Sequence, residues 1–159
     1  MASDLQSGDR APDVVLATSD GGTLTLAQLR GRPLVLYFYP KDDTPGCTTE
    51  AKDFSALKAA FDMVGVDIIG VSKNSAAQHA KFAAKHDLTI GLASDADDGV
   101  CAAFGTWVEK SLYGRKYMGI DRATFLIDAE GRIARIWRKV KVPGHAQQVL
   151  EAAETLARG

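Results

Sequence analysis

Pro33-Leu34-Val35-Leu36-Tyr37-Phe38-Tyr39 is a continuous run of apolar residues that is bounded by Gly31 and Pro40. A strand that is apolar at every position is buried on both of its faces, as in the parallel sheets that helices cover on each side. We therefore expect residues 33–39 to form the central strand of an α/β sheet, and the rest of the fold to be built outward from it.

The segments on either side of this run alternate between strand and helix patterns. Before it, Asp20-Gly21-Gly22 lies between short alternating pieces, which predicts an N-terminal hairpin over residues 14–26. Apolar residues at helical spacing predict helices over 47–62, 75–85, 99–104 and 146–157. Further strands are expected over 66–71, 89–93, 123–127 and 132–137. This order predicts βαβ units and a central mixed β-sheet flanked by helices.

The composition is that of one globular domain spanning residues 1–159, with 46% hydrophobic and 25% charged residues. The net charge of −1 gives no field that would attract nucleic acid or an anionic membrane. No apolar run approaches the roughly 20 residues that a transmembrane helix needs. The first residues also lack a basic segment followed by an apolar one, so we expect a cytoplasmic protein.

Cys47 follows Pro45-Gly46 at the start of an expected helix, just beyond the central strand. Open α/β sheets place their sites at this edge, and free N–H groups at a helix start favour an anion such as a thiolate. Lowering a thiol pKa from about 8.5 to about 6 requires about 3.4 kcal/mol, whereas a helix dipole supplies at most about 2 kcal/mol. A reactive Cys47 would thus need an arginine nearby. From position alone, a small buried residue is an equally good interpretation.

The segment around Cys47 favours the reactive interpretation. Pro40-Lys41-Asp42-Asp43-Thr44-Pro45-Gly46-Cys47-Thr48-Thr49-Glu50-Ala51 resembles the peroxidatic motif of peroxiredoxins, Pro-x-x-x-Thr-x-x-Cys, in the form found in the PrxQ or bacterioferritin comigratory protein group. The similarity runs from about Gly8 to the end and includes Phe104-Gly105-Thr106-Trp107 and the stretch 113–125. The resemblance implies a thioredoxin-like fold with an added N-terminal β-hairpin, and a monomer.

The resemblance also implies roles for individual residues. Cys47 would attack a hydroperoxide and become a sulfenic acid, while Thr44 and Arg122 would stabilise the sulfur and the peroxide oxygens. Pro40 would shield the pocket. This chemistry requires no cofactor and no metal.

Regeneration of Cys47 is where the chain departs from much of the PrxQ group. A resolving cysteine is common five residues later, where this chain has Lys52, or on the following helix, near Ala83 and Ala84. Cys101 is the only other cysteine. We expect it to be a small buried residue, with an unusual resolving role as the alternative. We therefore predict a one-cysteine cycle in which thioredoxin, glutaredoxin or glutathione reduces the sulfenic acid.

Two other classes of function remain to be weighed. A disulfide reductase would need Cys-x-x-Cys, which Cys47-Thr48-Thr49-Glu50 does not provide. A non-enzymatic redox sensor or binding module on the same fold is the alternative to an enzyme, and a measurement of catalytic turnover would distinguish the two.

His79, His86 and His145 lack the spacing of a zinc site, and we expect them to face solvent. The basic residues between 132 and 141 are expected on a solvated strand face, and residues 110–117 form a loop without an assigned role.

Overall fold

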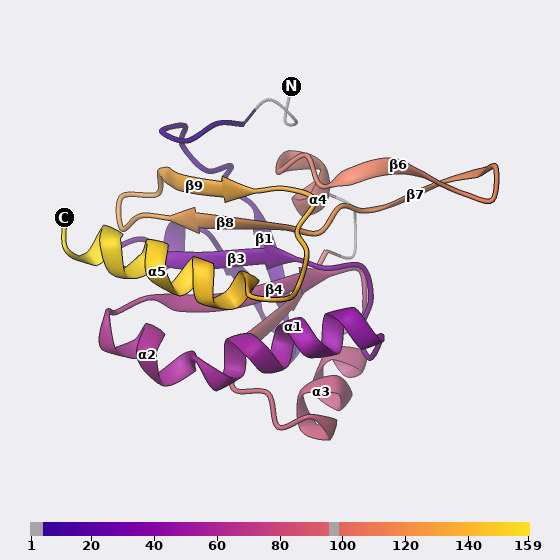
Figure 1. Cartoon of the computed structure of the whole chain (residues 1–159), viewed down its shortest axis with the longest axis horizontal. Helices are drawn as coiled ribbons and strands as arrows, with labels where there is room; N and C mark the ends of the chain where they lie inside the picture. Colours follow the sequence, from indigo (N-terminus) through magenta and orange to yellow (C-terminus); the bar gives the residue numbers. More distant parts are fainter. Residues whose placement is uncertain (1–4, 96–98) are drawn as a thin grey trace.

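The computed structural model describes residues 5–95 and 99–159. A seven-stranded sheet in the order β2-β1-β5-β4-β3-β8-β9 forms the centre of the molecule (Figure 1). Its strands are β1 (Val15–Thr18), β2 (Thr23–Thr25), β3 (Leu34–Phe38), β4 (Asp67–Ser72), β5 (Gly91–Ser94), β8 (Ala123–Ile127) and β9 (Ile133–Trp137). The helices are α1 (Pro45–Ala56), α2 (Lys58–Met63), α3 (Ala76–Lys85), α4 (Gly99–Ala103) and α5 (His145–Ala157), with a 3-10 turn, η2, at Ala27–Leu29.

The apolar run at 33–39 forms the central strand, as expected. β3 pairs with β4 in parallel and with β8 in antiparallel orientation, so the sheet is mixed. All five residues of β3 are buried. The expected hairpin at the N-terminus is also present, as β1 paired with β2, and β1 adds antiparallel to β5 at the sheet's edge.

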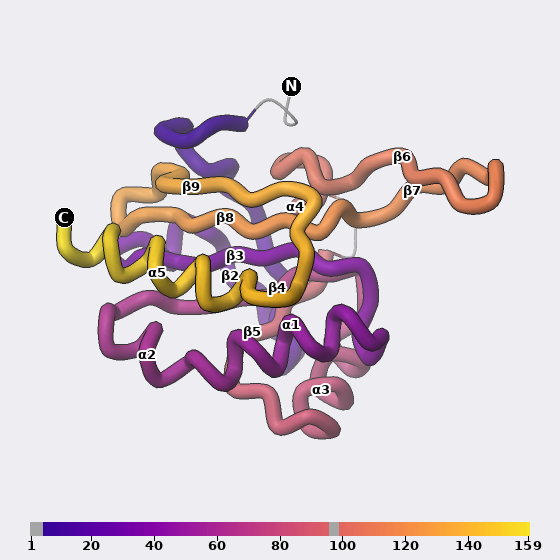
Figure 2. Tube along the Cα trace, in the orientation of Figure 1, coloured from indigo at the N-terminus to yellow at the C-terminus, as the bar shows by residue number. Residues whose placement is uncertain are grey.

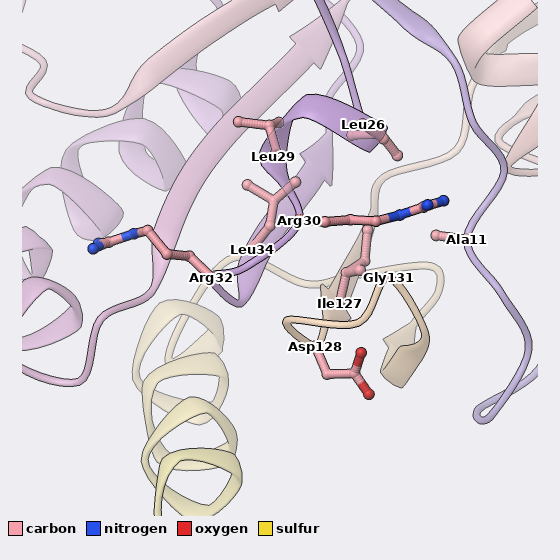
Figure 3. Close-up of a pocket in the computed structure, with 9 residues that line it drawn as sticks. All are labelled: Ala11, Leu26, Leu29, Arg30, Arg32, Leu34, Ile127, Asp128 and Gly131. Atoms are coloured by element: carbon pink, nitrogen blue, oxygen red, sulfur yellow. The ribbon is translucent and has the colours of Figure 1, made fainter.

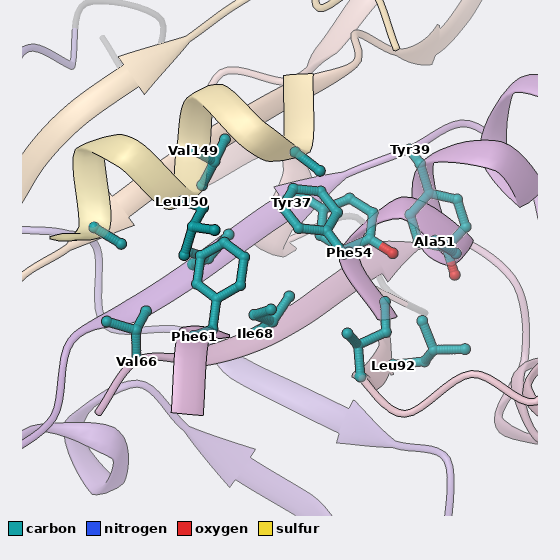
Figure 4. Packing of buried hydrophobic residues seen from close by; sticks show 14 of the residues in the cluster. Tyr37, Tyr39, Ala51, Phe54, Phe61, Val66, Ile68, Leu92, Val149 and Leu150 are labelled. Carbon is teal, nitrogen blue, oxygen red and sulfur yellow. The ribbon is translucent and has the colours of Figure 1, made fainter. Parts of the chain in front are cut away.

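Successive side chains of β3 enter two separate cores. Val35 and Tyr37 belong to a core with residues of α1, α2, α3 and α5, whereas Leu36 and Phe38 belong to a core with residues of α4 and the N-terminal segment. In the first core, Phe54 stacks on the Tyr37 ring (Figure 4). This alternation follows from the period of two along a strand, and it explains why the run is apolar throughout.

Two expectations from the sequence were wrong. The helix expected over 47–62 is divided into α1 and α2 at Leu57, whose backbone leaves the helical region with φ −96° and ψ 3°. Phe54, Leu57 and Phe61 keep helical spacing across the break, so the apolar pattern cannot reveal it.

The second error concerns the loop expected over residues 110–117, which is part of a two-stranded hairpin over residues 107–120. β6 (Trp107–Leu112) pairs antiparallel with β7 (Arg115–Ile120), and the pair projects from the body as an arm (Figure 2). Tyr113 and Gly114 form its turn with positive φ angles of 51° and 79°, which suits a tight hairpin. Most β7 side chains are exposed, so no buried face imposed the alternation by which strands are recognised.

Candidate active site

The loop after β3 carries the motif residues into the first turn of α1. Asp43 adopts a positive φ of 60°, and Thr44 is the extended residue from which α1 begins. Pro45 occupies the first helical turn, where its missing N–H costs no hydrogen bond. Cys47 follows on the inner side of the helix, and only 2% of its surface is exposed.

Arg122 reaches the sulfur of Cys47 from the short connection between β7 and β8. Its Nη2 donates to Cys47 Sγ at 3.3 Å, and its Nη1 donates to Glu50 Oε1 at 2.6 Å. A Cβ atom added at Gly46 would lie 3.3 Å from Arg122 Nη2, so the glycine leaves room for the guanidinium. The structure thus supplies the permanent cation that the free-energy argument for a thiolate requires.

Glu50 is a member of this site that the sequence reasoning missed. Its side chain is 1% exposed, and its Oε2 has no hydrogen-bond partner among the described residues. Burial raises the pKa of Glu50 to about 7, although the charge and hydrogen bond of Arg122 oppose that shift. The signal was available in the spacing, because residues three apart lie on one face of a helix and Glu50 follows Cys47 by three.

In the described part of the chain, Thr44 makes no hydrogen bond to the sulfur, and Pro40 has no side-chain donor with which to make one. The Thr44 hydroxyl donates to the carbonyl of Lys41 at 2.9 Å and makes no capping bond to the helix. Pro40 is exposed at the end of β3. The structure therefore brings Cys47 and Arg122 together, and it places Thr44 at the entrance of the same helix.

Cys101 lies in a different environment, on α4 and within the other core. The backbone N–H groups of Val100 and Cys101 donate to the Asp95 carboxylate at 3.0 and 2.7 Å. Burial raises the pKa of the Cys101 thiol to about 12, and the adjacent Asp95 carboxylate adds to this shift. Both cysteines are free. Lys52, at a familiar resolving position, is exposed on α1.

The expectation that the histidines face solvent was wrong for two of the three, and His86 is partly exposed. His79 is fully buried and His145 is 4% exposed. His145 begins α5, and its Nε2 lies 2.8 Å from the Thr124 hydroxyl of β8. Burial, with a smaller effect from the charge of Arg122, lowers the pKa of His145 to about 4. The sequence pattern could not show this, because tertiary packing at the ends of α3 and α5 covers both rings.

A small hollow lies at the opposite end of β3, lined by Leu34 of that strand, Ile127 of β8 and residues of the N-terminal segment (Figure 3). Its volume of about 20 Å³ is room for about one water molecule. Cys47 follows the other, carboxyl end of β3. The hollow therefore plays no part in the site around Cys47.

Comparison with known proteins identifies related sequences over most of the chain. The sequence profile of the AhpC/TSA family matches residues 7–136. Peroxiredoxin Bcp of Xanthomonas campestris is 48% identical over 146 residues, which cover 92% of this chain and 91% of that protein. Peroxiredoxin Bcp of Bacillus subtilis is 44% identical over 153 residues, covering 96% and 98%.

Solved structures give the same result for the fold. The bacterioferritin comigratory protein of X. campestris, whose alkyl peroxide reduction activity was studied through trapped intermediate and ligand complexes, matches with a TM-score of 0.90 and 45% identity. The match covers 96% of this chain and 99% of that one. BcpB of Mycobacterium tuberculosis matches with a TM-score of 0.84 and 32% identity, covering 96% and 98%.

Proposed function

The chain belongs to the AhpC/TSA family of peroxiredoxins, and from this premise we propose how its own residues carry out the reaction. It has the thioredoxin-like fold of those proteins and is a thiol-dependent peroxidase, with a peroxide as substrate and a thiol as reductant. A purely non-enzymatic sensor or binding module is not favoured. The roles of single residues, the kind of peroxide and the kind of thiol are the content of the proposal.

In the proposed first step, the Cys47 thiolate attacks one oxygen of a hydroperoxide. The S–O bond forms as the O–O bond breaks, and the departing oxygen takes up a proton, so that Cys47 becomes a sulfenic acid and the peroxide becomes water or an alcohol. Arg122 stabilises the thiolate and the charge that develops on the leaving oxygen. Glu50 holds the guanidinium in place through the 2.6 Å bond to Nη1.

The observation that carries this proposal is the 3.3 Å contact between Arg122 Nη2 and Cys47 Sγ. A fixed cation against the sulfur of a helix-start cysteine stabilises negative charge on that sulfur. Thr44 would have to turn its hydroxyl from the Lys41 carbonyl to reach the sulfur or a peroxide. We therefore propose that Thr44 acts once the substrate is bound, and that Pro40 limits access to the loop.

The proposed regeneration uses an external thiol. The thiol attacks the Cys47 sulfenic acid and releases water, which leaves a mixed disulfide, and a second thiol then releases Cys47 and a disulfide. Cys101 is a poor candidate for the first attack, because its raised pKa of about 12 keeps it as the thiol form at neutral pH. Thioredoxin, glutaredoxin and glutathione are the reductants to compare. Hydrogen peroxide and alkyl hydroperoxides are both proposed substrates, the latter because the X. campestris relative was studied for alkyl peroxide reduction.

We further propose that the chain acts as a single-domain monomer in the cytoplasm. Cys47, Glu50 and Arg122 all come from one chain, so the site needs no second subunit. Two free cysteines suit a reducing compartment. None of the helices in the described ranges has the length and apolar character to span a bilayer.

The test of this proposal is peroxide consumption by the wild type, Cys47→Ser and Cys101→Ser, with hydrogen peroxide or an alkyl hydroperoxide and each reductant in turn. Turnover that is lost in Cys47→Ser and kept in Cys101→Ser is the expected result. Turnover that survives in Cys47→Ser would contradict the assignment of the attacking sulfur. Turnover lost only in Cys101→Ser with every reductant would contradict the one-cysteine cycle.

A further inference from the structure

A buried polar cluster lies against the loop that leads to Cys47, and the steps described above do not use it. The Tyr39 hydroxyl donates to Asp42 Oδ1 at 2.6 Å, and His79 Nδ1 lies 2.7 Å from Asp42 Oδ2. All three residues are buried, and His79 has no exposed surface. Charged and polar groups are costly to bury unless each is paired, so this cluster requires an account of its protons.

Both ring nitrogens of His79 face acceptors. Nε2 lies 2.9 Å from the carbonyl oxygen of Ala93, which can only accept, so Nε2 carries a proton. Nδ1 faces a carboxylate oxygen at hydrogen-bond distance, which also requires a proton between the two atoms. The Tyr39 hydroxyl donates to the other oxygen of Asp42 and also lies 3.3 Å from His79 Nδ1, so it contacts both members of the pair. One proton therefore lies between His79 and Asp42, and it joins the two buried side chains directly.

The contact between His79 and Asp42 connects three parts of the molecule at the edge of the sheet where Cys47 lies. Asp42 belongs to the loop after β3, His79 to α3, and Ala93 to β5. The backbone N–H of Asp42 also donates to Asn74 Oδ1, at 2.9 Å, in the loop after β4. Asp42 precedes Thr44 by two residues and Cys47 by five, so whatever fixes Asp42 also limits the positions open to the first turn of α1.

We propose that His79 is a positioning residue for the peroxidase reaction: its buried ring, bonded to Ala93 and to Asp42, holds Asp42, and through Asp42 the loop that presents Thr44 and Cys47 to Arg122. This role rests on Cys47 being the attacking sulfur. Removing one partner of a buried, directly bonded pair leaves the other polar group without its hydrogen bond. The loop then separates more readily from α3, Cys47 is held less often against Arg122, and its buried sulfur is exposed more often.

The same loop contains a matched control. Asp43, the next residue, pairs with His86 Nε2 at 2.9 Å and with Lys85 Nζ at 2.7 Å, but half of its side chain is open to solvent. Exposed ion pairs contribute little because water screens them. His86→Gln removes a histidine–aspartate contact from the same loop at a carboxylate that is open to solvent, so it serves as the control for His79→Gln.

The kinetic experiment compares these two variants with the wild type. In folded His79→Gln we expect the rate constant for oxidation of Cys47 by hydrogen peroxide to fall about tenfold, because a small misplacement of the reacting groups lowers the rate strongly. Labelling of Cys47 by a bulky maleimide, located by peptide mass, should become faster by a similar factor. His86→Gln should stay within about twofold of the wild type in both assays. Equal rates for both variants would overturn the positioning role.

A second measurement does not depend on activity. Proton–nitrogen NMR of the wild type should show a slowly exchanging proton on His79 Nε2, which is buried against the Ala93 carbonyl, whereas exchange as fast as that of the His86 ring protons would overturn the proposal. If His79→Gln fails to fold, Tyr39→Phe is the substitute, because it removes only the hydroxyl that donates a hydrogen bond to Asp42. It should slow oxidation of Cys47 and speed its labelling, each by about threefold. Peroxide turnover that persists in Cys47→Ser would instead contradict the function, and it would leave the NMR result standing.

Discussion

Cys47 and Cys101 occupy similar positions and have opposite surroundings. Each is a buried, free cysteine and the third residue of a helix. The sulfur of Cys47 accepts a hydrogen bond from the guanidinium of Arg122, whereas the thiol of Cys101 lies beside the Asp95 carboxylate, and its pKa is raised to about 12. Burial and helix position are therefore not what distinguishes a reactive cysteine here. The charge that contacts the sulfur distinguishes it.

The two helix starts differ in the same sense. The Asp95 carboxylate accepts hydrogen bonds from the backbone N–H groups of Val100 and Cys101. These donors in the first turn of α4 therefore already bind an anion. The side chain of Thr44, which precedes α1, makes no such cap. The N–H groups and the dipole of the first turn of α1 therefore remain available to stabilise negative charge on the sulfur of Cys47.

The largest expected effect is the loss of the cation on Cys47. Arg122→Ala should lower the rate constant for oxidation by hydrogen peroxide by about 10²- to 10³-fold, because a fixed donor to developing charge is lost. Arg122→Lys is the control, since it keeps the charge without the two-pronged contact, and it should recover part of the rate. A wild-type rate in Arg122→Ala would contradict the claim that the charge in contact with the sulfur distinguishes Cys47 from Cys101.

The next test concerns Glu50, because its protonation determines how much negative charge lies beside Arg122 in addition to Cys47. Its folded pKa of about 7 lies above the ordinary value of 4.5, so the folded state holds the proton more tightly than the unfolded state does. The resulting stability is complete below pH 4.5 and is lost as pH rises through about 7, at a cost of about 3 kcal/mol.

The measurement is the free energy of unfolding of wild type and Glu50→Gln by denaturant, at the two ends of that pH range. The difference between the two proteins should change by about 3 kcal/mol across it. His145, with a lowered pKa of about 4, has the opposite dependence and loses stability as pH falls from 6.5, but it is present in both proteins and cancels. A difference that does not vary with pH would show that Glu50 is ionised throughout.

A smaller effect is expected at the second cysteine. Asp95→Asn removes the negative charge beside Cys101 but keeps an oxygen that can accept the two backbone N–H groups. We expect the pKa of Cys101 to fall while remaining above the ordinary thiol value, because burial is the larger cause of its shift. Unfolding should become easier by about 1–2 kcal/mol. Labelling of Cys101 in the folded variant as fast as that of Cys47 would mean that charge outweighs burial there.

The sequence predicts the sheet well because one physical signal dominates in it. Every residue of β3 is apolar, and only a strand with two covered faces requires that. The break at Leu57 and the hairpin β6–β7 were missed for complementary reasons. In the first case the apolar spacing continues across a backbone change, and in the second the exposed strands carry no apolar pattern at all.

The candidate site was only partly predictable. The helix-start argument identified Cys47 and the need for an arginine, but choosing Arg122 depended on a resemblance to the peroxiredoxins, since the two residues lie 75 positions apart in the chain. Glu50 and His79 were missed because an isolated acidic or histidine residue is usually solvated. Their roles depend on burial, and burial at the end of a sheet is decided by how distant helices pack.

The most direct test of the central claim, that Cys47 alone is oxidised and waits for an external thiol, is intact mass spectrometry under non-reducing conditions. Reduced protein is mixed with one equivalent of hydrogen peroxide in the absence of any thiol. We predict a mass gain of one oxygen in the wild type and in Cys101→Ser, and no change in Cys47→Ser. A mass loss of two hydrogens in the wild type that disappears in Cys101→Ser would show a disulfide between the two cysteines and contradict the claim.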